Sequence, residues 1–201
     1  MTNKKEKTFK LALMSLFIAI ILVMDFTPLG YIIMPSGFSI TLLTIPVALG
    51  AVCTGVWGGA VLGFVFGMTS FIQAFGLGFS LDPSAPILFS TSPLAYTVTC
   101  FVPRILVGVV AALIFKAFER ANKVNILAYI LSAASVPVLN TILFMTCFAV
   151  FYKNTVLGGK EVMAVVFSAF TLNFLVEFAV TLICGIVINK IIYTYLKKIT
   201  K

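Results

Sequence analysis

The chain has 201 residues, of which 61% are hydrophobic and only 10% are charged, and its mean hydropathy is +1.17. A soluble domain of this length could not cover so much apolar surface, so the composition excludes the soluble classes and predicts an all-α protein that crosses the membrane several times. The net charge of +8 does not indicate nucleic-acid binding, because most basic residues flank apolar runs, as they do in membrane proteins.

Residues suited to catalysis or metal binding are scarce. The chain has no histidine, and its four cysteines lie singly in or beside apolar runs, without metal-ligand spacing. Asp25 and Asp82 are not paired with other carboxylates, so no acidic cluster is predicted to hold Mg²⁺. We therefore expect a protein that is not an enzyme, uses no cofactor and has no metal site.

Apolar runs predict six transmembrane helices in a single membrane domain that covers residues 1–201. The predicted spans are 9–26, 39–53, 56–75, 93–118, 125–151 and 163–195. Pro46 is expected to interrupt the short second span. Two Xaa-Pro pairs are expected to keep the segment 76–92 non-helical.

The first span carries small residues at helical spacing. Ala12, Ser15 and Ala19 share a face, and Ser15 and Ala19 form a pair of small residues four positions apart. Such pairs let another helix approach closely. That helix belongs either to this chain or to an external partner.

The third span begins with glycine at every fourth position. The row consists of Gly55, Gly59, Gly63 and Gly67. It predicts a bare stripe against which another helix packs. No Gly-Lys-Ser/Thr follows, so the row does not indicate a phosphate-binding loop.

An even number of spans places both termini on one side, and the basic residues identify that side as cytoplasmic. The other side holds only Lys153 and Lys160. The side that carries both termini holds eleven basic residues: Lys4, Lys5, Lys7, Lys10, Lys116, Arg120, Lys123, Lys190, Lys197, Lys198 and Lys201. The loops 27–38 and 76–92 therefore face outside. Both are unusually apolar, which predicts that they fold back as lids over a cavity.

Arg104 is the least expected residue of the apolar runs. It lies about eleven residues beyond Pro93, which is roughly 16 Å into a core about 30 Å thick. An arginine at this depth costs at least about 2.5–3.5 kcal/mol on insertion scales, so we expect it to face the interior of the bundle. Asn140, Asn173 and Glu177 fall within about one turn of the same depth, and Asn173 and Glu177 share a helix face.

Two interpretations of these midplane residues remain open. In the first, Arg104 and Glu177 form a structural pair, and the asparagines satisfy backbone groups. In the second, a small solute enters from outside: Arg104 binds its anionic group, the asparagines hold hydroxyl or amide groups, and Glu177 orients Arg104 or accepts from the ligand. Gln73 and Tyr96 complete the predicted substrate-binding residues.

Four features together carry a resemblance to a known family. They are the basic first helix with its small face, the run SITLLTIPV at 39–47, the glycine row, and VPRILVG at 102–108. With these features the whole chain, including its length and six-helix layout, resembles the substrate-binding S components of energy-coupling factor (ECF) vitamin transporters. Within that family it looks most like the pantothenate type.

The resemblance implies a vitamin-uptake subunit of a prokaryotic cell membrane that works with a transmembrane scaffold subunit and two ATPases. It also implies that Ala12, Ser15 and Ala19 form the surface that docks onto the scaffold. Pantothenate has one carboxylate, two hydroxyls and an amide, which suits Arg104 and the two asparagines. The alternatives are an S component for riboflavin, pyridoxine or hydroxymethylpyrimidine, and a stand-alone secondary transporter, although no inverted repeat is visible.

Overall fold

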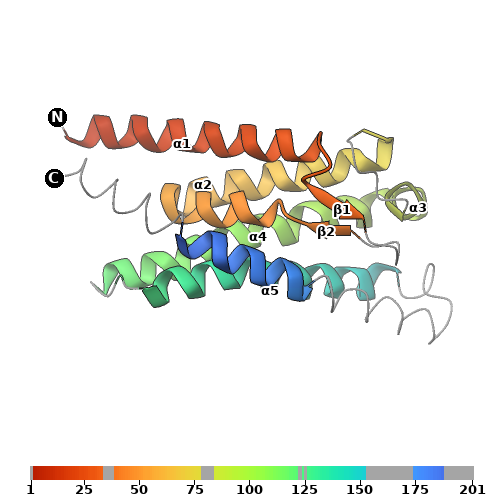
Figure 1. Cartoon of the computed structure of the whole chain (residues 1–201). Helices are drawn as coiled ribbons and strands as arrows, with labels where there is room; N and C mark the ends of the chain where they lie inside the picture. The colour runs from red at the N-terminus through yellow and green to blue at the C-terminus, as the bar shows by residue number, and fades with distance from the viewer. Residues whose placement is uncertain are drawn as a thin grey trace.

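The computed structural model describes residues 2–33, 39–77, 84–121, 124, 126–152 and 174–187. Most of them lie in helices that run side by side, as expected for an all-α membrane protein (Figure 1). The helices are α1 (Thr2–Asp25), α2 (Thr44–Ile72), the 3₁₀ helix η1 (Gln73–Phe75), α3 (Ser84–Thr91), α4 (Pro93–Arg120), α5 (Ile126–Tyr152) and an apolar helix, Phe174–Val187. The strands are β1 (Tyr31–Ile33) and β2 (Ser39–Thr41).

Four of the described helical elements are long and apolar enough to cross a bilayer. The predicted spans 93–118 and 125–151 coincide closely with α4 and α5. α1 begins earlier than predicted, at Thr2. The sixth predicted span, 163–195, is described only over residues 174–187, so the count of six stays a prediction.

A glycine turn divides α2 into two limbs. Gly55 has φ 80° and ψ −168°, and the chain reverses direction there (Figure 1). The limbs, residues 44–54 and 56–72, pack against each other, with Gly50 facing Leu62 and Gly59 facing Ala51. The assignment of Gly55 to the packing stripe is therefore wrong, because a positive φ makes this glycine the turn itself.

The remaining glycines of the row pack against α4. A Cβ on Gly59 would meet the carbonyl of Gly108, and a Cβ on Gly63 would meet the carbonyl of Arg104. One helical turn further along α2, a Cβ on Gly67 would likewise meet the carbonyl of Cys100. The predicted stripe is thus correct for these three positions, and the helix that lies on it is α4. The contact brings the two backbones together at the turn that carries Arg104.

The start of α2 differs from the predicted second span. Ser39–Thr41 is not helical but forms β2, which pairs antiparallel with β1. The helix begins at Thr44, so Pro46 lies in its first turn and does not interrupt it. Proline is tolerated there because the N–H that it lacks would have no partner within the helix. Periodicity alone did not separate this short apolar strand from a helix.

The segment 76–92 also contains a helix, contrary to the prediction. α3 occupies Ser84–Thr91, with Pro86 in its first turn. α3 and the β-hairpin lie at the same end of the bundle, opposite the Gly55 turn (Figure 1). This is the end predicted to face outside. The function of the two loops as lids stays a prediction, and their residues 34–38 and 78–83 lie outside the described part of the chain.

Candidate functional site

Arg104 is held by its own helix and by two aromatic rings. Its Nη1 donates hydrogen bonds to the carbonyls of Thr99 (2.9 Å) and Cys100 (3.2 Å). Pro103 has no N–H to offer the Thr99 carbonyl, so the arginine satisfies the acceptor that the proline leaves free. The guanidinium carbon lies 5.0 Å from the centroid of Phe66 and 5.7 Å from that of Phe144, within the range of cation–π attraction.

Only part of the guanidinium is satisfied in this way. The side chain is 8% exposed, and its Nε is buried without a hydrogen-bond partner among the described residues. A buried donor with no acceptor costs about 1–3 kcal/mol, and more where the group is charged. These contacts fix the position of the Arg104 guanidinium. They leave its Nε–H to donate a hydrogen bond to a group that is not part of the described chain.

Glu177 lies on the helix Phe174–Val187 and is 2% exposed. Its carboxylate accepts a hydrogen bond from Thr44, whose hydroxyl also lies 3.3 Å from that of Thr181. Thr44 begins the first limb of α2, which rises only about 16 Å and therefore starts inside the membrane. The positive end of this helix dipole favours the nearby carboxylate. Sequence reasoning missed Thr44. The available signal was Pro46, two residues later, because proline is common in the first turn of a helix.

Arg104 and Glu177 attract each other without forming a direct ion pair among the described residues. Oε1 of Glu177 is buried without a partner, as is Oδ1 of Asn140 on α5. Asn140 lies one turn from Phe144, which contacts Arg104. A purely structural pair would be expected to satisfy its own atoms. One open donor and two open acceptors therefore favour the interpretation in which a ligand completes the site.

Tyr31 approaches the guanidinium from the end of the bundle that carries the β-hairpin. The side chain is 6% exposed, and its hydroxyl lies 3.0 Å from Oγ of Ser70. Burial raises the pKa of the Tyr31 phenol to about 12, while the charge of Arg104 acts in the opposite direction. A neutral phenol thus lies within electrostatic reach of Arg104. Sequence reasoning missed this residue because it placed 27–38 in a loop without assigning individual roles.

Gln73 and Tyr96, both predicted to bind substrate, have hydrogen-bond partners within the protein. Nε2 of Gln73 donates to Oδ1 of Asp25 at 3.4 Å, and the hydroxyl of Tyr96 donates to the carbonyl of Ser70 at 2.9 Å. Both side chains are buried, and so is Asp25. These bonds tie α1 to η1 and α4 to α2. Substrate contact by Gln73 and Tyr96 stays a prediction, and Asn173 lies outside the described residues.

The small residues of α1 face away from the rest of the described chain. Ala12, Ser15 and Ala19 are all exposed, whereas Phe17 and Ile21 are buried in the core that α1 shares with α2. The hydroxyl of Ser15 donates to the carbonyl of Leu11 at 3.0 Å, so the face presents no unsatisfied hydroxyl to lipid. Packing within the described part of the chain therefore does not account for this face.

Two comparisons with known proteins show what the chain is similar to. Residues 9–193 match the family described as "ECF transporter, substrate-specific component". The chain is also 33% identical over 159 residues to "Pantothenic acid transporter PanT" of Lactococcus lactis subsp. cremoris (strain MG1363), an alignment that covers 76% of this chain and 78% of the relative.

These are transport proteins and not enzymes, and the apolar helices fit a multi-pass protein of the cell membrane. The family match extends over most of the chain, which confirms the resemblance seen in the sequence. The chain belongs to the substrate-specific components of energy-coupling factor transporters.

Proposed function

We propose that this chain is the substrate-specific subunit for pantothenate uptake. The observation that carries the proposal is the buried guanidinium of Arg104 with an open Nε, accompanied by open acceptors on Asn140 and Glu177. One cation and two acceptors complement a ligand that has one carboxylate and several hydroxyl or amide donors. Pantothenate has one carboxylate, two hydroxyls and one amide. The printed name of the Lactococcus relative supports the same vitamin.

Each group has a distinct role in the proposed complex. Arg104 binds the carboxylate by a charge-assisted hydrogen bond, which is roughly twice as strong as a neutral one. Asn140 and Glu177 accept hydrogen bonds from the hydroxyl and amide groups. Phe66 and Phe144, which flank the guanidinium, offer apolar surface to the dimethyl part of the vitamin. Thr44 and the start of α2 hold Glu177 in position.

Mass spectrometry of small molecules released from the purified protein tests the vitamin assignment. The expected result is pantothenate at about one molecule per chain, because the open buried groups are stabilised when they are paired. Riboflavin, pyridoxine or hydroxymethylpyrimidine would each appear at its own mass. Recovery of one of these in place of pantothenate would contradict the proposal while leaving the family assignment intact.

We also propose that the exposed small face of α1 docks onto a scaffold subunit that is coupled to two ATPases. Replacing Ala19 with leucine is expected to abolish co-purification with these subunits, because a larger side chain prevents close approach of another helix. Vitamin binding is expected to stay unchanged, since Ala19 lies on the outer face of α1. Affinity pull-down and calorimetry measure the two properties.

The control for this experiment is Ile142→Phe, which enlarges a side chain that is 55% exposed on α5. It is expected to retain both assembly and vitamin binding. If Ala19→Leu assembles as the wild type does, α1 is not the docking surface. Loss of assembly in both variants would point instead to a general requirement for the lipid-facing surface.

A stand-alone secondary transporter makes a different prediction from a subunit that depends on ATPases. Vesicles that contain this chain alone are expected to show no net uptake of the vitamin under a proton or sodium gradient. Addition of the scaffold and ATPase subunits with ATP is expected to start uptake. Gradient-driven accumulation by the chain alone would contradict the proposed partners.

The hydroxyl of Tyr31 is expected to slow release of the bound vitamin. Tyr31→Phe removes the hydrogen bond between the β-hairpin and Ser70. A neutral hydrogen bond contributes about 1 kcal/mol net, so the dissociation rate is expected to rise about fivefold in a radioligand chase. Thr146→Val is the control, because its exposed hydroxyl bonds only the carbonyl of Ile142 within α5 among the described residues. Equal rates in the two variants would exclude a specific role of the hairpin.

A further inference from the structure

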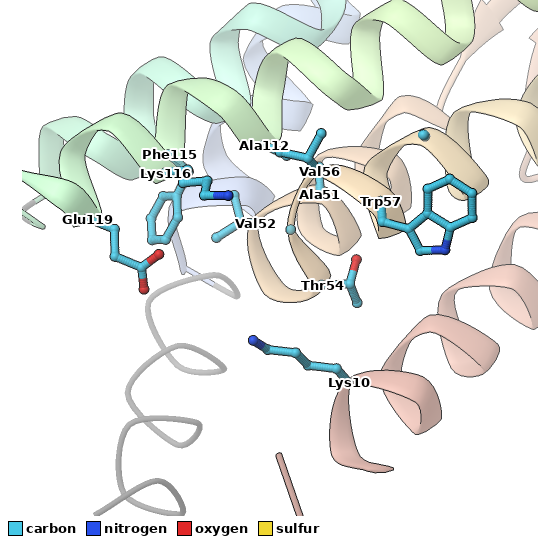
Figure 2. A pocket seen from close by; sticks show the side chains of 12 residues that line it. Lys10, Ala51, Val52, Thr54, Val56, Trp57, Ala112, Phe115, Lys116 and Glu119 are labelled. Atoms are coloured by element: carbon cyan, nitrogen blue, oxygen red, sulfur yellow. The ribbon is translucent and has the colours of Figure 1, made fainter. Parts of the chain in front are cut away.

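A second concave site lies at the opposite end of the bundle from the β-hairpin. Its cavity of about 560 Å³ opens around the Gly55 turn, between α1 and α4 (Figure 2). Arg104, Asn140 and Glu177 are not among its lining residues. Its volume falls in the range of about 300–1,000 Å³ that small-molecule sites occupy. The proposed vitamin site does not explain this cavity.

Two amines from different helices enter the cavity from opposite sides. Lys10 extends from α1, and Lys116 extends from α4 (Figure 2). Glu119 adds one carboxylate, so the described residues of the lining carry a net charge of +1 from two lysines and one glutamate. A single phosphodiester, which carries one negative charge, would neutralise this excess. Charge complementarity therefore favours a monoanionic group over a more highly charged solute.

Apart from Thr54, the rest of the described lining is apolar, and it includes the only tryptophan of the chain. Val52, Val56 and Phe115 form part of the wall, and Trp57 is 78% exposed beside it. Tryptophan is enriched where a membrane meets water, which places the opening at headgroup depth. The excess of lysine and arginine assigns this end to the cytoplasmic side. A pair of amines beside an apolar wall suits a phosphate that is attached to a glycerol and acyl chains.

We propose that this cavity binds the phosphodiester headgroup of an anionic phospholipid of the inner leaflet. Lys10 and Lys116 bind the phosphate, and the wall formed by Val52, Val56 and Phe115 contacts the glycerol region. Basic pockets between membrane helices on the cytoplasmic side are a known setting for such headgroups. Its described lining includes neither the residues of the proposed vitamin site nor Ala12, Ser15 and Ala19 of the docking face.

Trp57 provides a local reporter for the test, because no other tryptophan contributes fluorescence. The full chain is reconstituted in phosphatidylcholine liposomes, which contain no other protein, with increasing fractions of phosphatidylglycerol that carries brominated acyl chains, which quench nearby indoles. Quenching is expected to saturate at a low fraction of phosphatidylglycerol. Brominated phosphatidylcholine is expected to quench only in proportion to its mole fraction.

Charge-matched variants separate the cavity from the general surface charge. The double substitution Lys10→Gln and Lys116→Gln is expected to weaken the apparent lipid affinity about tenfold or more, since each lysine near an anionic surface contributes on the order of 1 kcal/mol. Lys7→Gln with Arg120→Gln removes the same charge at the same end, but neither residue lines the cavity. This control is expected to change the affinity less than threefold. Circular dichroism and thermal unfolding establish that both variants fold.

Three results would overturn the proposal. Equal weakening in the two double variants would assign the effect to diffuse surface charge. Equal quenching by the two brominated lipids would exclude a preference for anionic headgroups. Displacement of phosphatidylglycerol by millimolar inorganic phosphate at constant ionic strength would identify the ligand as a free phosphate-bearing solute and not a lipid.

Discussion

Replacing Arg104 with glutamine is expected to weaken pantothenate binding about 100-fold. The substitution removes the cation that the carboxylate pairs with and leaves the bound anion in a buried site without compensation. Loss of one partner of a buried, hydrogen-bonded charge pair costs 2–5 kcal/mol or more, and about 2.7 kcal/mol corresponds to a factor of 100. Isothermal titration calorimetry in detergent measures the change, and the thermal unfolding midpoint shows whether the variant is folded.

The neutral analogue pantothenol, which has an alcohol in place of the carboxylate, makes the test specific. The wild type is expected to prefer pantothenate strongly, whereas Arg104→Gln is expected to bind the two compounds nearly equally. Arg120→Gln, at the C-terminal end of the same helix, is the control for loss of one positive charge. A folded Arg104→Gln variant that binds pantothenate as tightly as the wild type would exclude Arg104 as the anion-binding residue.

Adding a methyl group at Gly63 is expected to lower both stability and vitamin affinity. A Cβ there would overlap the backbone carbonyl of Arg104 and crowd the backbone of Ile105, so α4 must move away from α2. Overpacking of this kind costs about 1–3 kcal/mol, which corresponds to a decrease of several degrees in the unfolding midpoint. Because the displaced turn carries Arg104, we expect Gly63→Ala to reduce pantothenate affinity about tenfold as well.

The control for Gly63→Ala is Leu113→Phe, which enlarges an α4 side chain that is 49% exposed. It is expected to change neither the unfolding midpoint nor the affinity. Calorimetry and thermal unfolding apply to both variants. Wild-type behaviour of Gly63→Ala would contradict the close backbone contact between α2 and α4. A loss of stability without a loss of affinity would show that the position of Arg104 does not depend on this contact.

The sequence predicted well those helices whose ends are marked by local chemistry. α4 begins at Pro93, where Ser92 caps the helix by accepting a hydrogen bond from the N–H of Ala95. Serine before proline at a helix start is a strong local signal. The glycine row predicted a helix-packing stripe, and α4 lies on it at Gly63. Both features depend on residues that are close together in the chain.

Features that depend on distant partners or on a single dihedral angle were predicted poorly. The strand β2 is stabilised by pairing with β1, a contact that local periodicity does not encode. Gly55 continues the four-residue pattern of the row, so spacing alone did not distinguish the turn from the stripe. The sequence alone predicts that Pro46 and Pro86 interrupt a helix, but both lie in first turns, where proline is compatible with the helix.

Position in the sequence indicates the depth of the midplane residues but not their detailed surroundings, and their contact with substrate stays a prediction. Arg104, Asn140 and Glu177 were selected because they are polar at similar depths, and all three have open buried atoms. Thr44 and Tyr31 were missed, because their contributions depend on where α2 begins and on how the β-hairpin folds. Such contacts join segments that are far apart in sequence, so residue type and spacing alone do not reveal them.

Calorimetric titration of the purified chain, after bound vitamin has been removed by unfolding and refolding, with pantothenate, riboflavin, pyridoxine and hydroxymethylpyrimidine tests the proposed function most directly. Pantothenate alone is expected to bind, with a stoichiometry of about one, and pantothenol is expected to bind far more weakly. Tight binding of another of these vitamins, or of pantothenol as tightly as pantothenate, would contradict a pantothenate site built around Arg104.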